Sequence, residues 1–164
     1  MTDAEKAQAK QFMPGARMAG YIGAAISAIV VPLMFSITAL YYLLAGKIAG
    51  APVSFKHGLS LAVWSAMPTA LTLVVATVGA LTMAPQTPQF SLMLTNVDPL
   101  LVQLPMDHAL STLAKNFNLL GLWALALGAV GWKTFTRSGW GSAVFVAALP
   151  SVLIYGIWLL IALL

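Results

Sequence analysis

The sequence predicts an all-α, polytopic membrane protein with four transmembrane helices and a long apolar connection between the second and the third. Two observations predict this fold class. Of the 164 residues, 60% are hydrophobic, and only 12 carry a formal charge, 8 Lys or Arg and 4 Asp or Glu. That is 7% charged residues, against roughly 25% in soluble domains, so the chain has too little polar surface to cover a water-soluble globule. The charges also stand between long apolar runs, as charges that flank membrane spans do.

The same composition excludes several classes of partner and site. The net charge is +4, but the basic residues are scattered singly and do not form the stripe that binds nucleic acid. The chain has no cysteine, which excludes disulfides, thiolate metal sites and thiol redox motifs. The first partner that we expect is therefore the lipid bilayer.

Four stretches between the charges are long enough to be membrane spans, because ~20 apolar residues in a helix cross ~30 Å of hydrocarbon. The predicted spans are about residues 20–45, 58–83, 114–132 and 140–164. Pro85 and Pro88 end the second span, and the third is the tightest because Lys115 and Lys133 bound it, so Lys133 is expected to snorkel. Residues 1–18 are predicted as a surface segment and 19–164 as one four-helix domain. A secretory signal peptide is the rival interpretation of the first span, but its apolar run is too long.

Three of these spans contain a proline, and three contain small residues at regular spacing. Pro32, Pro68 and Pro150 each lie inside one, where they either shape a bundle or break a helix and expose carbonyls to an ion or substrate. Small residues recur every four positions, which allows helix backbones to approach closely. These residues are Gly20, Ala24 and Ala28, then Ala62, Ala66 and Ala70, then Ala124 and Gly128. Their partners are either the other helices of this chain or another subunit.

The connections differ in character. Residues 46–57 and 133–139 are short and basic, and they must share one side of the membrane. Counting Lys and Arg alone gives a draw between the two sides, and the four acids on the other side favour a cytoplasmic location for the basic connections. The long connection, residues 84–115, is rich in Leu and Met with four prolines. We expect it to lie along the membrane interface or against another protein, with a short helix from Pro105 to Ala114.

The residues offer little chemistry. The interiors of the four predicted spans contain no Asp, Glu, Arg, Lys or His, which argues against a proton-coupled transporter or an intramembrane protease. Asp107 and His108 are adjacent, and Asp98 is the candidate third ligand of a metal site. Two or three ligands on a proline-broken loop, with no helical HExxH-type spacing, are weak evidence for a metal, so solvated polar residues at an interface are the favoured interpretation. We therefore predict no metal, no cofactor and no enzymatic activity. Trp64 and Trp123 lie deeper in their spans than interfacial belt residues do, as packing anchors would.

Two runs resemble the bacterial Yip1-domain family. The first is ALYYLLAGKIAGAPVSFKHGLSLAVWSAMP, Ala39 to Pro68, in which a helix ends in a glycine-containing turn, a Ser-Phe-Lys step follows and a proline lies in the next helix. The second is NLLGLWALALGAVGW, Asn118 to Trp132, similar to the family's Asp-x-Phe-x-x-Trp helix with a glycine eight residues after the Trp. Asn118 and Leu120 depart from that pattern. The resemblance implies five spans, of which this chain would match the last four, with its N-terminus outside.

By resemblance, we expect a non-catalytic accessory or assembly subunit of a transport complex, such as a MacB-like ABC exporter, as a multi-pass protein of the bacterial inner membrane. The alternative is a small transporter or channel that works as a homo-oligomer around its proline-broken helices. An integral membrane enzyme is the least favoured class, because no catalytic constellation is visible. The expected contacts with other subunits are Gly20, Ala24, Ala28, Trp123, Gly128, Asp98, Asp107 and His108.

Overall fold

The computed structural model describes residues 16–83, 92–105 and 108–163, and it confirms an all-α chain. These residues belong to two compact units, residues 1–37 and residues 38–164, and each is described by itself. Within the described ranges the only bridge between extended segments is an isolated antiparallel one, Asn96 with Asn118. The helical elements are α2 (Ala16–Ile48), α3 (Phe55–Ser65), η1 (Met67–Ala70), α4 (Leu71–Thr82), α5 (Val97–Leu100), α6 (Ser111–Asn116), α7 (Leu120–Thr136) and α8 (Trp140–Leu163).

The first and last predicted spans are confirmed as helices. The segment Tyr21–Ile48 of α2 and the whole of α8 are long and apolar enough to cross a membrane. A third crossing is obtained if α3 and the η1–α4 segment together form one bent span. The count of four spans stays a prediction. The predicted surface segment, residues 1–18, lies outside the described residues up to position 15 and enters α2 at Ala16.

The second span is broken where the sequence carries Pro68. Proline has no backbone N–H to donate, and its ring clashes with the preceding turn of a helix. Accordingly α3 ends at Ser65 and a 3₁₀ turn follows. The two halves meet at an angle of 41°. The helix also begins earlier than predicted, because Ser54 and His57 form a capping box in which each side chain binds the other's backbone N–H. Sequence reasoning missed this box because His replaces the usual Glu or Gln.

The third span differs most from its predicted bounds of 114–132. The backbone leaves the helical region at Phe117 (ψ 102°), which separates α6 from α7. The seventeen residues of α7 span roughly 25 Å, less than the ~30 Å of a hydrocarbon core. At the other end α7 continues past the predicted limit to Thr136, and the ammonium group of Lys133 lies over the Trp140 ring, 4.8 Å from its centroid. The helix ends at Arg137, which adopts the left-handed conformation (φ 53°).

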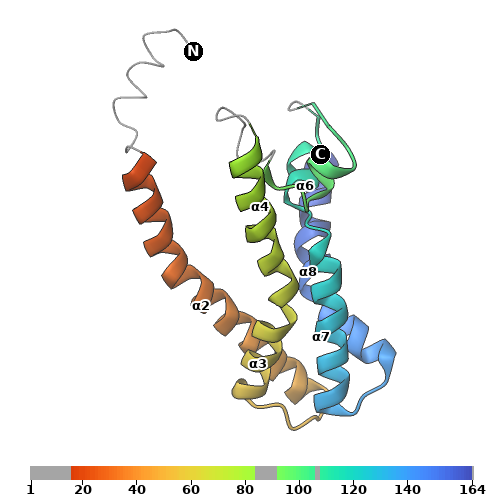
Figure 1. The fold of residues 1–164 in the computed structure, drawn as a ribbon. Helices are drawn as coiled ribbons and strands as arrows, with labels where there is room; N and C mark the ends of the chain where they lie inside the picture. The colour runs from red at the N-terminus through yellow and green to blue at the C-terminus, as the bar shows by residue number, and fades with distance from the viewer. Residues whose placement is uncertain (1–15, 84–91, 106–107, 164) are drawn as a thin grey trace. The chain divides into compact units, whose positions relative to one another are not determined.

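The core of the second unit is built around Trp132. Its indole is fully buried and stacks on the Tyr42 ring at a centroid distance of 5.9 Å. Alanines on α7 and α8 allow these helices to approach closely, and the two run side by side with the α3–η1 segment against α7 (Figure 1). The buried cluster consists of Tyr42, Leu61, Ala129, Trp132, Ala143 and Ala147.

Pro150 has a specific consequence for this packing. Proline has no N–H, so the carbonyl of Val146, four residues earlier in α8, loses its usual intrahelical donor. The hydroxyl of Tyr41 in α2 donates to that carbonyl at 2.6 Å. A proline that is tolerated in the helix thus provides an acceptor for a bond between helices.

Candidate functional site

The described part of the long connection that begins at Leu92 folds back onto the chain's own helices, and its expected location at the membrane interface or against another protein stays a prediction. Leu92 lies beside Gly79 in α4, and Thr95 reaches Thr72 at the start of that helix. Thr72 lies ten residues before the end of α4 at Thr82, which is roughly 15 Å along the helix. The connection therefore returns to the level of the break in the second span.

We call residues 92–98 of the long connection the returning segment. An antiparallel pairing holds the returning segment against the start of α7. Val97 N–H donates to the carbonyl of Phe117, and Leu119 N–H donates to that of Thr95, both at 2.9 Å. This pairing uses backbone groups that would otherwise be unsatisfied between α6 and α7. The pairing also explains why α7 is short, because residues 117–119 are engaged in it and the helix begins only at Leu120.

Asn118 organises the side chains at this point. Its amide nitrogen donates to Thr72 Oγ1 at 2.9 Å and to Thr95 Oγ1 at 3.3 Å. Its amide oxygen accepts from the N–H of Leu120, the first residue of α7, at 2.8 Å, a bond that orders the turn into this helix. One side chain therefore joins α4, the returning segment and α7. We call this group, with Asn96 and Asp98, the polar junction.

Two further polar side chains of the junction are almost fully buried. Asn96 is 8% exposed and donates from its amide nitrogen to the Lys115 carbonyl at 2.5 Å. Asp98 is 5% exposed and lies in α5 with a non-helical backbone (φ −105°, ψ 118°). Asp98 Oδ2 and Asn96 Oδ1 have no hydrogen-bond partner among the described residues. The carboxylate of Asp98, which the sequence predicted at an interface, is thus buried by this chain's own residues.

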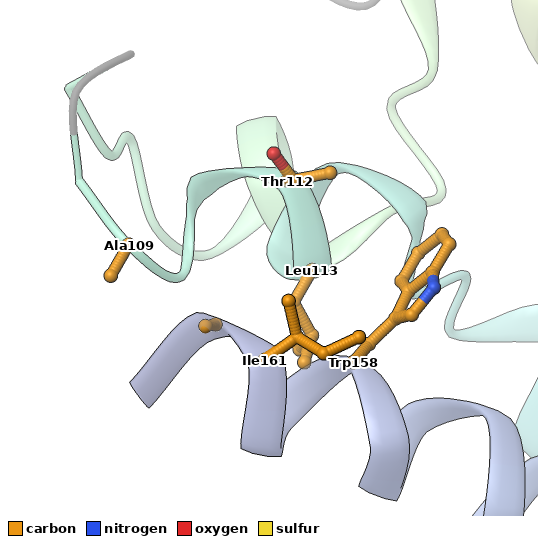
Figure 2. Close-up of a pocket in the computed structure, with 6 residues that line it drawn as sticks. Ala109, Thr112, Leu113, Trp158 and Ile161 are labelled. Atoms are coloured by element: carbon orange, nitrogen blue, oxygen red, sulfur yellow. The ribbon is translucent and has the colours of Figure 1, made fainter. Parts of the chain in front are cut away.

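Next to the polar junction, the end of α6 packs against α8. Phe117 packs on Tyr155 with ring centroids 4.9 Å apart, and the Tyr155 hydroxyl donates to the carbonyl of Asn116 at 3.1 Å. Beyond this contact an apolar pocket of about 380 Å³ opens between α6 and the end of α8, with Trp158 and Ile161 below Leu113 and Thr112 (Figure 2). This packing gives the predicted short helix a place within the chain, although it starts at Ser111 and not at Pro105.

A second surface feature lies between α3 and α7, a groove of about 460 Å³ that we call the α3–α7 groove. Its rim includes Trp64, which is 68% exposed, and Met67. On α7, Leu127 and Val130 continue a stripe that begins with Trp123, because positions four and seven residues apart share a helix face. The lining is completed by Ser60, Leu61, Ser65, Gly131 and Phe135.

The residues predicted to contact partners occupy different environments. Gly20, Ala24 and Ala28 share one face of α2, in the first unit. Trp123 is half-exposed on α7, and its contact with another subunit stays a prediction. Gly128 is buried, and a Cβ there would lie 3.2 Å from Tyr42 Oη and 3.6 Å from Ala147 Cβ, so it serves the chain's own packing.

The remaining predicted contacts belong to the long connection. Asp98 is buried in the polar junction, and Asp107 lies outside the described residues. His108 is exposed, and its Nδ1 accepts from Leu110 N–H at 3.1 Å, which orders the turn before α6. Within the described ranges no three His, Asp or Glu side chains gather as metal ligands would.

The Yip1 domain model matches residues 4–162 of this sequence. The chain belongs to the Yip1 domain family. Comparisons with curated proteins and with solved structures found no match. The Yip1 match covers both runs that carried the resemblance, and the second run contains Asn118 and Trp132, the centres of the polar junction and of the core. With its long apolar helices, this Yip1 domain chain is a membrane protein.

We expect replacement of Asn118 to separate its two roles. Asn118→Leu removes the acceptor for Leu120 N–H and leaves Thr72 and Thr95 without their shared donor, so the free energy of unfolding should fall by about 1–3 kcal/mol. Asn118→Asp should cost less, because a carboxylate keeps the acceptor for Leu120 N–H while the two threonine hydroxyls turn to donate to it. Unfolding in mixed detergent–SDS micelles, followed by circular dichroism, measures both. Equal losses for Leu and Asp would contradict this account.

Proposed function

We propose that this Yip1 domain chain is a non-catalytic accessory or assembly subunit of a transport complex in the bacterial inner membrane, of the MacB-like ABC exporter kind. The observation that carries the proposal is the α3–α7 groove. We propose that one transmembrane helix of a partner subunit packs there. The lipid bilayer fills the remaining apolar surface of the chain.

The side chains of the groove suit a helix. Trp64 and Trp123 supply large contact areas at a low cost in side-chain entropy, and tryptophan is the residue type most enriched among energetically dominant contacts. Ser60 and Ser65 in the groove lining are small, so a partner backbone can approach closely at these two positions. Large side chains beside small ones are the features that helix-in-groove recognition uses.

The two histidines support a non-catalytic role. The Nδ1 atom of His57 accepts from Ser54 N–H at the start of α3, and its ring stacks on Phe135 at 5.3 Å. His108 accepts a backbone N–H in the same way before α6. An imidazole that is occupied as a hydrogen-bond acceptor is not placed as a general base.

We expect Trp64→Ala combined with Trp123→Ala to abolish partner recovery. The substitutions remove Trp64 from the rim of the groove and Trp123 from the α7 stripe that leads into it. Each such anchor contributes about 2 kcal/mol or more to binding, so the pair should lower affinity by a factor of at least about 100. The measurement is affinity purification from native membranes, with a photo-crosslinking residue at position 127 and mass spectrometry of the adduct. Trp158→Ala is the matched control, since it removes a tryptophan of α8 that lines the pocket against α6 and not the α3–α7 groove.

The result separates the proposal from its alternative. Crosslinking to a subunit of an export complex, lost only in the double variant, supports an accessory role. Crosslinks only to a second copy of this chain would contradict it and favour the homo-oligomeric transporter or channel, for which the break at Pro68 beside the polar junction is the favourable observation. Solute flux in liposomes that contain the purified chain alone would then be the decisive measurement.

A further inference from the structure

Four helices meet at one end of the second unit, and basic residues gather there. The His57 ring at the start of α3 stacks on Phe135 near the end of α7, with ring centroids 5.3 Å apart. Lys133 of α7 lies over the ring of Trp140, the first residue of α8. The end of α2 and the first turns of α8 line one pocket. We call this the basic end, and its Lys and Arg residues are Lys47, Lys56, Lys133 and Arg137.

Acidic residues of the described ranges do not balance this charge. Asp98 is the only Asp or Glu within them, and it lies in the polar junction beside the start of α7. Lys133 stands thirteen residues beyond the first residue of α7, which is roughly 20 Å along the helix. Exposed charges are largely screened beyond ~8 Å at physiological ionic strength. The basic end therefore attracts an anion.

The pocket at this end, which we call the α2–α8 pocket, has a volume of about 380 Å³. Sites for small molecules typically measure ~300–1,000 Å³. The Tyr41 hydroxyl, its one polar side-chain group, donates to the carbonyl of Val146 at 2.6 Å and joins the two helices. The rest of the lining is apolar and includes Leu44, Ile48, Ala49, Phe145 and Leu149. A hydrocarbon chain is the kind of group that fits such a lining.

Lys47 places a positive charge next to this apolar lining. It lies three residues after Leu44 and one before Ile48, in the last turn of α2, and its side chain is exposed. A lysine at a membrane boundary covers apolar surface with its stem and keeps its ammonium group at the level of the lipid headgroups. A ligand that combines a hydrocarbon chain with a negative group matches both features.

We propose that the α2–α8 pocket binds one acyl chain of an anionic phospholipid, whose phosphate group contacts Lys47. Groups of four or more basic residues beside membrane helices are typical of sites for anionic lipids. The excess positive charge selects an anionic headgroup over a zwitterionic one, and the pocket distinguishes this lipid from the rest of the bilayer. The site lies on α2 and α8, so it does not depend on the α3–α7 groove.

Native mass spectrometry of the full chain in detergent tests the headgroup. The probes are dioleoylphosphatidylglycerol, which is anionic, and dioleoylphosphatidylcholine, which is zwitterionic and has the same acyl chains. We expect saturable binding of one phosphatidylglycerol per chain, at least about tenfold tighter than phosphatidylcholine. Lys47→Gln should weaken phosphatidylglycerol binding about fivefold, the usual contribution of one basic residue, and leave phosphatidylcholine unchanged. Arg17→Gln removes the same charge thirty residues earlier in α2 and should retain the preference.

Ala49→Phe tests the acyl chain. Ala49 is exposed and lines the pocket, so a phenyl ring there fills part of the space without changing the charge. We expect at least about threefold weaker binding of both lipids, because the acyl chain loses close contacts with the lining.

Three outcomes would overturn the proposal. Equal affinities for the two lipids would show that charge does not select the ligand. Phosphatidylglycerol binding that is unchanged in Lys47→Gln, or reduced equally in Arg17→Gln, would mean that the phosphate group does not contact Lys47. Unchanged binding in Ala49→Phe would show that the lipid is held by its headgroup alone, outside the pocket.

Discussion

Trp132→Ala is expected to lower the free energy of unfolding of the second unit by about 3–5 kcal/mol, the range for truncating a large buried aromatic side chain. The indole is fully buried, and it is the largest side chain in that state among the described residues. Its neighbours cannot close the resulting cavity, because three of the other five members of the buried cluster are alanines on closely packed α7 and α8. Tyr42 would also lose its stacking partner.

The measurement is reversible unfolding in mixed detergent–SDS micelles, followed by circular dichroism so that the loss of a tryptophan does not affect the signal. Trp123→Ala is the matched control, since Trp123 lies on the same helix but is 52% exposed, and we expect it to change the unfolding free energy by no more than about 0.5 kcal/mol. Similar losses for both variants would show that Trp132 is not the centre of the core.

Trp132→Phe separates packing from hydrogen bonding. The Nε1–H group of Trp132 is buried without an acceptor among the described residues, so replacing the indole by a phenyl ring sacrifices no hydrogen bond there. Phenylalanine keeps a ring to stack on Tyr42 and leaves a smaller cavity than alanine. We therefore expect Trp132→Phe to retain most of the stability that Trp132→Ala loses. A loss as large as that of alanine would contradict a role based on packing alone.

The parts of the fold that the sequence predicted are those fixed by local patterns. Uninterrupted apolar runs predicted α2 and α8, because the length needed to cross a bilayer can be counted directly. Pro68 was visible as a potential break, but Pro32 and Pro150 presented the same local pattern and lie inside continuous helices. Which proline breaks its helix depends on tertiary neighbours such as Tyr41, whose hydroxyl binds the carbonyl that Pro150 leaves free.

The polar junction could not be predicted in the same way. Asp98 stands among prolines in the long connection, and its burial depends on pairing with residues 117–119, about twenty positions further along the chain. Nothing local in the sequence specifies that pairing. The available signal was indirect: the connection is too apolar for a solvated loop, and Asn118 replaces the family's usual Asp at a helix start. The interiors of the predicted spans contain no charged residue, whereas the fold buries the carboxylate of Asp98 in the connection between the second and the third.

Gly58→Ala is the second substitution for which we expect a large effect, about 2–3 kcal/mol of lost stability. A Cβ at Gly58 would lie 2.5 Å from the carbonyl oxygen of Ala39 and 3.2 Å from its Cα. Ala39 is fully buried in α2, and these are backbone atoms, which cannot rotate away as a flexible side chain can. The crossing of α2 and α3 must therefore open, which disturbs the adjacent contact of Tyr42 with Trp132.

The higher intrinsic helix propensity of alanine opposes the steric loss of stability that we expect for Gly58→Ala, so the direction of the change tests which effect is larger. Alanine is favoured over glycine inside a helix by about 1 kcal/mol, so an unobstructed glycine should gain stability from the same substitution. Gly156 in α8 is the matched control, because a Cβ there would meet nothing within 4 Å. We expect Gly156→Ala to be neutral or stabilising and Gly58→Ala to be destabilising in the same micellar unfolding measurement. If the two variants change stability in the same direction, close backbone contact at Gly58 is not what holds α2 against α3.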